Sequence, residues 1–309
     1  MTIVVQVENL RKSYGAKTAV ADVSFTVERG EIFGILGRNG AGKTTTVETL
    51  AGLRRADGGS LSVLGIDPRK DPQAIRAVLG VQLQEARLPA KITVIEALEL
   101  FASFYPHPAD PEELIGMLGL GEHRGKQFAK LSGGLKQRLS IALALVGSPQ
   151  VAVLDELTTG LDPQARRDVW DLVERVRDSG VTIILVTHFM DEAERLCDRL
   201  VVIDEGRIVA AGSPKELVRG GSDERTFRMR LPEGAADPVE LIESLADVHT
   251  VSTIEDELEV TGTTHVLPAV ILALAEVGVV PDEIRTTTRT LEDVFVDVTG
   301  HPVEEELAA

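Results

Sequence analysis

A glycine-rich segment between a short apolar run and a helical stretch is the feature that most limits how this chain can fold. Glu31 to Leu36 is predicted to be a buried strand, and Lys43 to Leu53 is predicted to be a helix. Between them the sequence reads Gly37-Arg38-Asn39-Gly40-Ala41-Gly42-Lys43-Thr44, which fits the pattern G-x-x-x-x-G-K-S/T. A strand, a glycine loop and a helix in this order predict an α/β fold with an anion site at the loop.

The spacing of this segment has a physical reason. Glycines let the backbone curl so that several N–H groups point at one anion, and the following helix adds its positive dipole end. Lys43 can reach the β- and γ-phosphates of a nucleotide, and the Thr44 hydroxyl can ligate Mg²⁺. A glycine turn that matches by chance is the alternative, and the strand before it and the helix after it argue against that alternative.

A second apolar run ends in two acidic residues. Val151 to Leu154 is predicted to be a strand beside the first one, with Asp155 and Glu156 at its carboxyl end. Asp155 is suited to hold Mg²⁺, and Glu156 is suited to polarise an attacking water. Two such carboxylates by themselves are often a solvated strand end, but next to a phosphate-binding loop they predict a hydrolytic site.

Apolar strands alternate with helical stretches up to residue 211. This order indicates a mainly parallel sheet covered on both faces. Further strands are predicted at 3–8, 23–28, 181–186, 199–203 and 207–211, and further helices at 92–104, 111–118, 135–146, 163–177 and 190–197.

Acidic residues are concentrated at the end of the chain. The 309 residues include 32 Lys+Arg and 49 Asp+Glu, a net charge of −17. Residues 1–220 hold 27 basic and 29 acidic side chains (27 − 29 = −2), and residues 221–309 hold 5 and 20 (5 − 20 = −15). The sequence therefore predicts two domains, 1–220 and an acidic accessory domain at 221–309. No nucleic-acid partner is expected, because phosphate contacts need Lys and Arg.

The acidic tail has its own order of elements. Strands are predicted at 226–231, 248–254, 258–261 and 284–288, and helices at 238–245, 267–277 and 291–298. The order strand, helix, strand, strand, helix, strand suits a small α+β domain of the ferredoxin-like type.

The sequence predicts a protein of a reducing compartment without a membrane span. Cys197 is the single cysteine, so no internal disulfide can form. We expect no signal peptide, because the residues after Met1 have neither a basic region nor a cleavage site. The most apolar stretch, Val266 to Val280, is shorter than the ~20 residues that span a bilayer and is interrupted by Pro268 and Glu276.

A third motif connects these sites to a known family. Leu131-Ser132-Gly133-Gly134, followed by a predicted helix and then by the acidic strand, resembles the signature of the ABC ATPases. With the two motifs above, the resemblance covers about residues 3–220, with a helical subdomain at about 85–150. It implies a P-loop core with a RecA-like mixed sheet, antiparallel β and helical subdomains, and an activity that binds and hydrolyses ATP with Mg²⁺.

The resemblance assigns roles to single residues at matching positions. Tyr14 looks like the aromatic that stacks on adenine, with edge packing as its ordinary alternative. Gln84 looks like the glutamine that joins the core to the helical subdomain; Gln82 is the alternative, but the distance to the next predicted helix favours Gln84. Gly160-Leu161-Asp162 resembles the D-loop, and His188 resembles the switch histidine that senses the γ-phosphate.

The family pattern gives a complete candidate site. The residues expected to contact the nucleotide are Tyr14, Gly37, Arg38, Asn39, Gly40, Ala41, Gly42, Lys43, Thr44, Thr45, Ser132, Gly133, Gly134 and Asp162. The expected catalytic residues are Glu156, His188 and Gln84, and the expected metal ligands are Thr44, Gln84 and Asp155. The family implies a head-to-tail dimer, in which the signature of one copy closes over ATP bound to the glycine loop of the other.

Two positions depart from the family pattern. Leu135 replaces the common glutamine after the signature, and Leu157 replaces the common proline after Glu156. The first change is expected to tune nucleotide binding, since the contacts would come from Ser132 and the glycine backbone. The second frees the backbone after Glu156, which puts in doubt how rigidly that carboxylate is placed.

The end of the tail narrows the resemblance. Leu291-Glu292-Asp293-Val294-Phe295 looks like the ending of daunorubicin-type drug-resistance exporter ATPases, with an ordinary amphipathic helix as the alternative. That resemblance implies a peripheral subunit on the cytoplasmic face of the cell membrane, whose partner is an ABC-2 type permease. The region from Gln84 to Leu100 is expected to receive a cytoplasmic helix of this permease.

Three other functions stay open at this point. Soluble ABC ATPases that act on DNA or ribosomes usually carry two ATPase modules or long insertions, whereas this chain has one module. The tail ending argues modestly against an importer ATPase. A non-hydrolysing module is disfavoured because Lys43, Asp155, Glu156 and His188 are all present. The exported compound is expected to be selected by the permease, with drugs, lipids and other hydrophobic compounds as candidates.

Overall fold

The computed structural model describes residues 2–82, 88–220, 225–232, 237–254, 257–287 and 289–301. The chain divides into a first unit, residues 1–217 with 295–309, and a second unit, residues 218–294. The described residues 295–301 thus group with the first unit, and the predicted domains, 1–220 and 221–309, stay a prediction.

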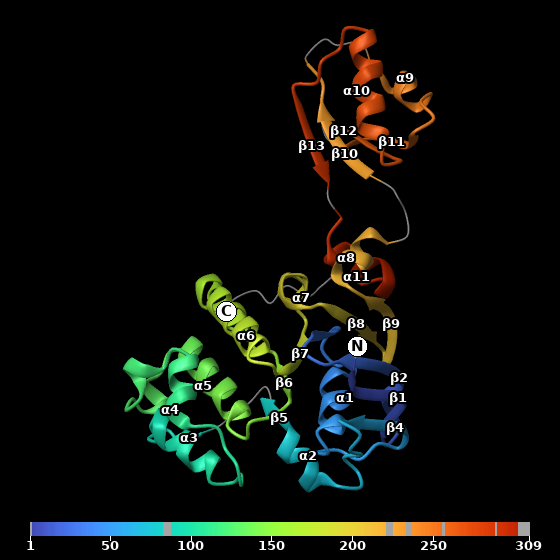
Figure 1. Ribbon diagram of the computed structural model, residues 1–309. Coiled ribbons are helices and arrows are strands. Elements are labelled where there is room, and N and C mark those ends of the chain that lie inside the picture. Colours follow the sequence, from blue (N-terminus) through green and yellow to red (C-terminus); the bar gives the residue numbers. More distant parts are fainter. Residues whose placement is uncertain are drawn as a thin grey trace. The chain divides into compact units, whose positions relative to one another are not determined.

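Among the described residues, nine strands form the central sheet of the first unit, in the order β4-β1-β2-β9-β8-β3-β7-β6-β5 (Figure 1). Parallel pairs join β8, β3, β7, β6 and β5, whereas β1, β2 and β4 pair antiparallel. The sheet is therefore mixed, which confirms the expected fold class. The strands are β1 Ile3–Tyr14, β2 Lys17–Glu28, β3 Ile32–Leu36, β4 Gly58–Val63, β5 Leu79–Gln82, β6 Val151–Asp155, β7 Thr182–Thr187, β8 Arg199–Asp204 and β9 Arg207–Gly212.

The position of β7 corrects one expectation. The strand that ends at Asp155 was expected beside the strand that precedes the glycine loop, and this is wrong, because β7 lies between β3 and β6. Every residue of β7 is buried, so this apolar strand belongs at the centre of the sheet. Its register sets Leu36 opposite Thr187 and Asp155 opposite Val186, so the three strand ends lie level with one another.

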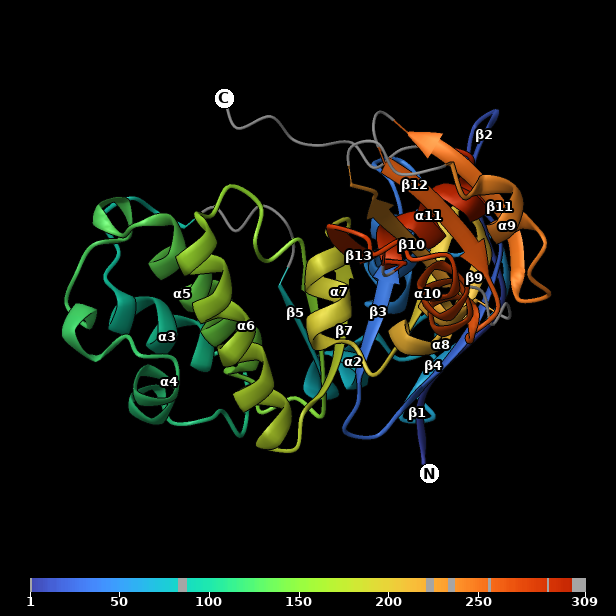
Figure 2. The same cartoon turned by 90° about the horizontal axis from the view of Figure 1, so that it is seen from above.

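Helices of the first unit follow the predicted pattern and add α2 and α8. Figure 2 shows α3, α4 and α5 gathered together with α6 beside α5, and these helices contact one another. Thr93 and Glu96 form a reciprocal capping box at the start of α3, which explains why this helix begins there. The helices are α1 Lys43–Leu50, α2 Pro72–Val78, α3 Val94–Ala102, α4 Pro111–Met117, α5 Gly133–Leu145, α6 Pro163–Asp178, α7 Met190–Leu196 and α8 Pro214–Arg219, which crosses into the second unit.

The second unit has a four-stranded sheet in the order β11-β12-β10-β13, in which all pairs are antiparallel. Two interlocked strand–helix–strand units give this order, so the predicted ferredoxin-like arrangement is confirmed. Alternate residues of β10 and β12, such as Phe227 and Val260, are buried in a core with α10. The elements are β10 Arg225–Arg230, α9 Val239–Glu243, β11 Val248–Ile254, β12 Glu257–Gly262, α10 Val266–Glu276 and β13 Glu283–Thr287.

The last helix, α11 (Leu291–Thr299), crosses the boundary between the units after Val294. Its start is a capping box, in which the Thr290 N–H donates to Asp293 Oδ2 (2.8 Å) and the Asp293 N–H donates to Thr290 Oγ1 (3.3 Å). The apolar residues of the tail motif are buried, including Phe295. In the described part of the chain, no helix has the length and apolar character that a membrane span requires.

Candidate active site

The glycine loop connects β3 to α1 and lines a pocket of about 400 Å³. Gly37 and Gly42 are required by close approach: a Cβ on Gly37 would collide with the Ile203 carbonyl oxygen, and a Cβ on Gly42 would collide with that of Ala19. Gly42 is also the N-cap residue of α1, with a φ of 108°. Since glycine has no side chain that could cap the helix, the first N–H groups of α1 are left for an anion.

Lys43 is buried beneath this loop. Its Nζ donates hydrogen bonds to the carbonyl oxygens of Gly37 (2.6 Å) and Arg38 (3.1 Å). Burial lowers the pKa of Lys43, and the nearby Glu156 and Asp155 carboxylates act in the opposite direction. The loop thus holds one cation at its centre, close to two acidic groups, which suits the binding of a phosphate together with a metal ion.

Residues of the β1–β2 hairpin complete the rim of the pocket. Tyr14 is 42% exposed there, and the cationic groups of Lys12 and Arg54 lie 5.3 and 5.6 Å from its ring centroid. Lys17 was missed by the sequence analysis; it pairs with Tyr14 across the turn at Gly15, and a hairpin register would have revealed it. The lining residues are Tyr14, Lys17, Ala19, Arg38, Asn39, Gly40, Gly42, Lys43, Thr44, Thr45 and Glu156.

Asp155 ends β6 as a fully buried carboxylate. Among the described residues, neither of its oxygens has a hydrogen-bond partner. Burial and the neighbouring Glu156 raise the pKa of Asp155 to about 6, against the lowering effect of Lys43. A buried carboxylate without donors fits a cation, and the Thr44 hydroxyl is a second oxygen suited to Mg²⁺.

A metal at this point would need further ligands from the nucleotide or from water. In the ranges that the structure describes, no group of three or more His, Cys, Asp or Glu side chains is arranged to hold a metal ion. Mg²⁺ commonly keeps several waters and binds one or two carboxylates plus substrate phosphates. The donor set therefore fits a metal that arrives with a nucleotide.

Glu156 is held in an unusual backbone conformation, with a φ of 50°. Its N–H donates to the Val186 carbonyl oxygen of β7 (2.9 Å), and the next side chain, Leu157, is buried. Both contacts hold the backbone at this point in the absence of the proline.

Glu156 and His188 form a close pair. His188 Nδ1 lies 3.5 Å from Glu156 Oε1, and the histidine is buried beside the Phe189 ring. His188 lowers the pKa of Glu156, and Lys43 adds to this effect, whereas burial opposes it. The net result is an ionised carboxylate that can accept a proton from water.

The structure describes only one of the two candidate glutamines. Gln84 lies outside the described residues. Gln82 is buried in β5, where its Oε1 accepts a hydrogen bond from the Asp155 N–H (3.0 Å). This contact, which the sequence analysis missed, ties β5 to the carboxyl end of β6.

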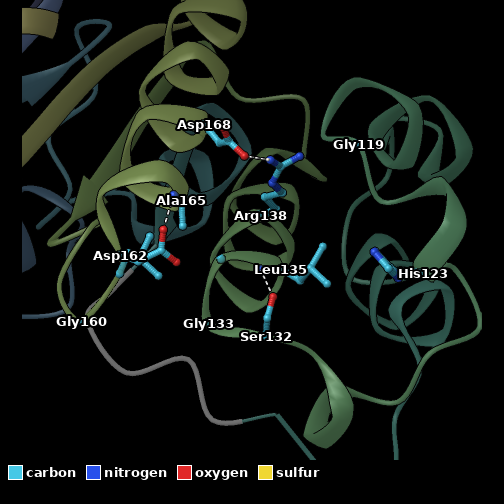
Figure 3. A pocket seen from close by; sticks show the side chains of 12 residues that line it. Gly119, His123, Ser132, Gly133, Leu135, Arg138, Gly160, Asp162, Ala165 and Asp168 are labelled. Carbon is cyan, nitrogen blue, oxygen red and sulfur yellow. Dashed lines mark hydrogen bonds and ion pairs between the residues drawn. The ribbon is translucent and has the colours of Figure 1, made fainter.

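The signature and D-loop residues line a second pocket, of about 410 Å³, shown in Figure 3. Ser132 caps α5 by accepting a hydrogen bond from the Leu135 N–H (3.4 Å), and Asp162 caps α6 by accepting one from the Ala165 N–H (2.9 Å). This pocket is lined by Gly119, His123, Ser132, Gly133, Gly134, Leu135, Arg138, Gly160, Leu161, Asp162, Ala165 and Asp168. It shares no residue with the glycine-loop pocket, so the predicted nucleotide contacts form two separate groups within one chain.

Comparisons with known proteins agree with this geometry. The ABC transporter family model matches residues 20–159. The chain is 37% identical to the Nod factor export ATP-binding protein I of Mesorhizobium japonicum, over 98% of this chain and 89% of that protein. It is 34% identical to the daunorubicin/doxorubicin resistance ATP-binding protein DrrA of Streptomyces peucetius, over 98% of this chain and 94% of that protein.

A solved structure of an ATP-binding subunit of an ABC transporter matches with a TM-score of 0.63 and 30% identity, over 70% of this chain and 92% of that one. Fold, motifs and full-length relatives therefore agree. The chain belongs to the ABC transporter family, in which it is an ATP-binding transport ATPase of the exporter type.

Proposed function

We propose that this chain hydrolyses MgATP at the ends of β3, β6 and β7 and that this reaction powers a membrane exporter. The observation that carries the proposal is the convergence of Lys43, Asp155, Glu156 and His188 at these strand ends, where Lys43 and Glu156 line the glycine-loop pocket. ATP, when bound, supplies the γ-phosphoryl group, and Mg²⁺ neutralises charge on its oxygens.

The glycine loop holds the phosphates in this proposal. Lys43 presents its ammonium group to them, and the N–H groups from Gly40 to Thr45 donate hydrogen bonds. Thr44 and Asp155 would hold the metal, with Gln84 as a further ligand, and Tyr14 would stack on the base. Support comes from the buried oxygens of Asp155, which have no hydrogen-bond partner in the described ranges, and from the start of α1, where the N-cap residue Gly42 provides no side-chain cap.

Glu156 is the proposed general base. Its lowered pKa keeps it ionised, so it can orient water and accept its proton. His188, 3.5 Å away, positions this carboxylate and stabilises charge near the γ-phosphate. Phosphoryl transfer needs little covalent chemistry from the protein, so positioning and electrostatic stabilisation carry the rate enhancement.

We also propose that two copies pair head to tail. The Ser132 and Lys43 pockets of one chain share no residue, which supports a site completed by Ser132, Gly133, Gly134 and Asp162 of a second copy. ATP can drive such closure only by binding the closed dimer more tightly than the open one.

The Glu156→Gln variant tests the hydrolytic role. It should keep ATP binding, lose roughly 10²–10³-fold in turnover, and accumulate as an ATP-bound dimer. Phosphate release measures the turnover, and sedimentation velocity measures the dimer. Glu113→Gln, at an exposed position on α4, is the matched control and should behave like the wild type. A Glu156→Gln enzyme that hydrolyses ATP freely would refute the assignment.

The proposed partner is an ABC-2 type permease, which would place this chain at the cytoplasmic face of the membrane. Exposed apolar side chains in and just after α3 support a docking surface there: Leu100, in the predicted region, is 46% exposed, and Phe104, just beyond it, is 68% exposed, with its ring 5.8 Å from that of Phe101. The exported compound is proposed to be a drug, a lipid or another hydrophobic compound, since the relatives are named for Nod factor export and daunorubicin resistance.

Co-purification tests this partnership. A neighbouring gene product with about six spanning helices should co-purify with the chain and support ATP-dependent transport in vesicles. Phe104→Asp should reduce co-purification without changing ATP binding, whereas Val209→Asp, at an exposed position on β9, should change neither. Co-purification that is equal for both variants would contradict the docking surface.

A further inference from the structure

Helix α10 of the second unit is apolar on both sides. Its inward residues, Val266, Val270 and Leu274, are buried in the core of this unit. On the other side Leu272 is 67% exposed, and Val280, which follows the helix, is 72% exposed. A helix that is apolar all round is ordinarily buried on all sides, so the outward side of α10 has the character of an interface.

The exposed residues of α10 form a continuous seam. Positions 265, 268, 272 and 275 are all exposed and are spaced by three and four residues, so they lie along one side of the helix. Figure 1 shows α10 lying over the sheet of this unit, with α9 beside it. We define the α10 face as His265, Pro268, Ala269, Leu272, Ala275 and Glu276.

The ends of the α10 face are complementary to each other. His265 stands at the N-terminus, Glu276 is the only Asp, Glu, Lys or Arg of the helix and stands at its C-terminus, and both are exposed. If two copies of the face meet antiparallel about a two-fold axis, each His265 lies against the other copy's Glu276. The same register sets Leu272 over the small Ala269 of the other copy, and the two helix dipoles oppose each other.

We propose that the α10 face is a contact between two copies of this chain, with the two helices antiparallel. The proposal rests on the proposed function, in which two copies act together, and adds a second contact independent of nucleotide. A second copy is the occupant because the face is self-complementary. Glu276 is the only acidic group on the face, so two tails of net charge −15 can meet here with few like charges in direct contact.

Sedimentation velocity of the nucleotide-free full chain tests the contact. The wild type should associate as concentration rises, and Leu272→Glu should raise the dissociation constant by about tenfold or more. Ile254→Glu is the matched control, since it adds the same charge at an exposed apolar position of β11 and should leave association unchanged. A wild type that stays monomeric at every concentration, or equal effects of the two variants, would overturn the proposal.

Charge exchange tests the register. His265→Glu sets two acidic groups against each other and should weaken association, and the double variant His265→Glu/Glu276→Lys should restore it. A double variant no tighter than the single one would overturn the antiparallel register. Leu272→Cys should also cross-link with a short bis-maleimide, whereas the wild type should not, because its one cysteine, Cys197, is buried. Absence of this cross-link would count against the contact.

Nucleotide separates this proposal from the proposed function. In a Glu156→Gln background with MgATP, Leu272→Glu should still dimerise, because the nucleotide sites lie in the first unit. Loss of the ATP-dependent dimer in Glu156→Gln itself would contradict the proposed function. Loss of the nucleotide-free dimer alone would contradict only the α10 contact.

Discussion

The two units use charged side chains in opposite ways. In the first, Lys43, Asp155 and Glu192 are buried, at or near the ends of the central strands. In the second, charges lie in rows on the sheet face opposite the helices, where Arg228 pairs with Glu259 (2.7 Å) and Arg230 pairs with Glu257 (2.9 Å). Burying a charge costs desolvation free energy, so buried charges often belong to functional sites. Exposed ion pairs cost little desolvation free energy and contribute little to stability.

Glu192 illustrates the first kind of charge outside the nucleotide pocket. It lies on α7, four residues after His188, and accepts a hydrogen bond from Trp170 Nε1 (3.2 Å). Burial raises its pKa, and the Thr187, Trp170 and Thr158 side chains counteract this. The carboxyl group thus joins α6 and α7 near the carboxyl end of β7.

The largest expected effect tests whether the two units are independent. Phe227→Ala removes a buried ring from the core of the second unit and should destabilise that unit by about 3–5 kcal/mol. Scanning calorimetry should show one transition moving down, while ATP binding by the first unit is kept. If Phe227→Ala abolished ATP binding when it unfolded the second unit, the two units would not be independent.

The next effect concerns the buried cation. Lys43→Ala should weaken ATP binding by roughly 100-fold, about 2.7 kcal/mol, because it leaves the phosphates and two carboxylates without their central positive charge. Isothermal calorimetry measures the affinity, with the exposed Lys70→Ala as control. An unchanged ATP affinity in Lys43→Ala would refute the assignment of the glycine loop as the phosphate-binding site.

A smaller effect is expected at Glu192, and its sign follows from the pKa. A carboxyl group whose folded-state pKa is raised above its ordinary value of 4.5 destabilises the fold as pH rises through the raised pKa. Glu192→Gln should therefore raise the melting temperature by a few degrees at pH 8, and the gain should vanish below pH 4.5. Trp170, the single tryptophan, reports the transition by fluorescence. A gain equal at both pH values would contradict the raised pKa.

The smallest effect is expected on the open sheet face. Arg228→Ala should change the stability of the second unit by less than about 1 kcal/mol, because its ion pair with Glu259 is partly exposed. A double-mutant cycle with Glu259→Ala measures the pair directly. A coupling energy above that range would mean that these rows contribute to stability as buried charges do.

The sequence predicted most of the central strands, because β3, β6 and β7 are wholly buried and read as continuous apolar runs. It missed β4 and β5. β4 begins with Gly58-Gly59-Ser60 and is held by pairing with β1, as at Val5 and Val63, and the four-residue β5 pairs with β6. Local pattern cannot show such a strand, since its partner lies far away in the sequence. The tail was predicted well because each of its strands and helices is separated by a clear break.

The sequence also predicted the main residues of the candidate site, but not their arrangement across the sheet. Motif spacing predicted Lys43, Asp155 and Glu156, and the family resemblance predicted His188; the structure brings these four residues to neighbouring strand ends. The sequence could not show that β7 separates the two motifs or that Gln82 binds the Asp155 backbone, since both depend on the order of strands across the sheet. The second pocket around Ser132 likewise depends on how α5 and α6 begin.

The central place of β7 has a mechanical consequence. It pairs residue by residue with β3 on one side and β6 on the other, so the base of the glycine loop, His188 and the two carboxylates follow directly from one set of paired strands. These strands cannot move apart without breaking ladder hydrogen bonds. A conformational change that keeps these strand pairs intact is therefore confined to segments around the sheet, such as the group of α3, α4 and α5.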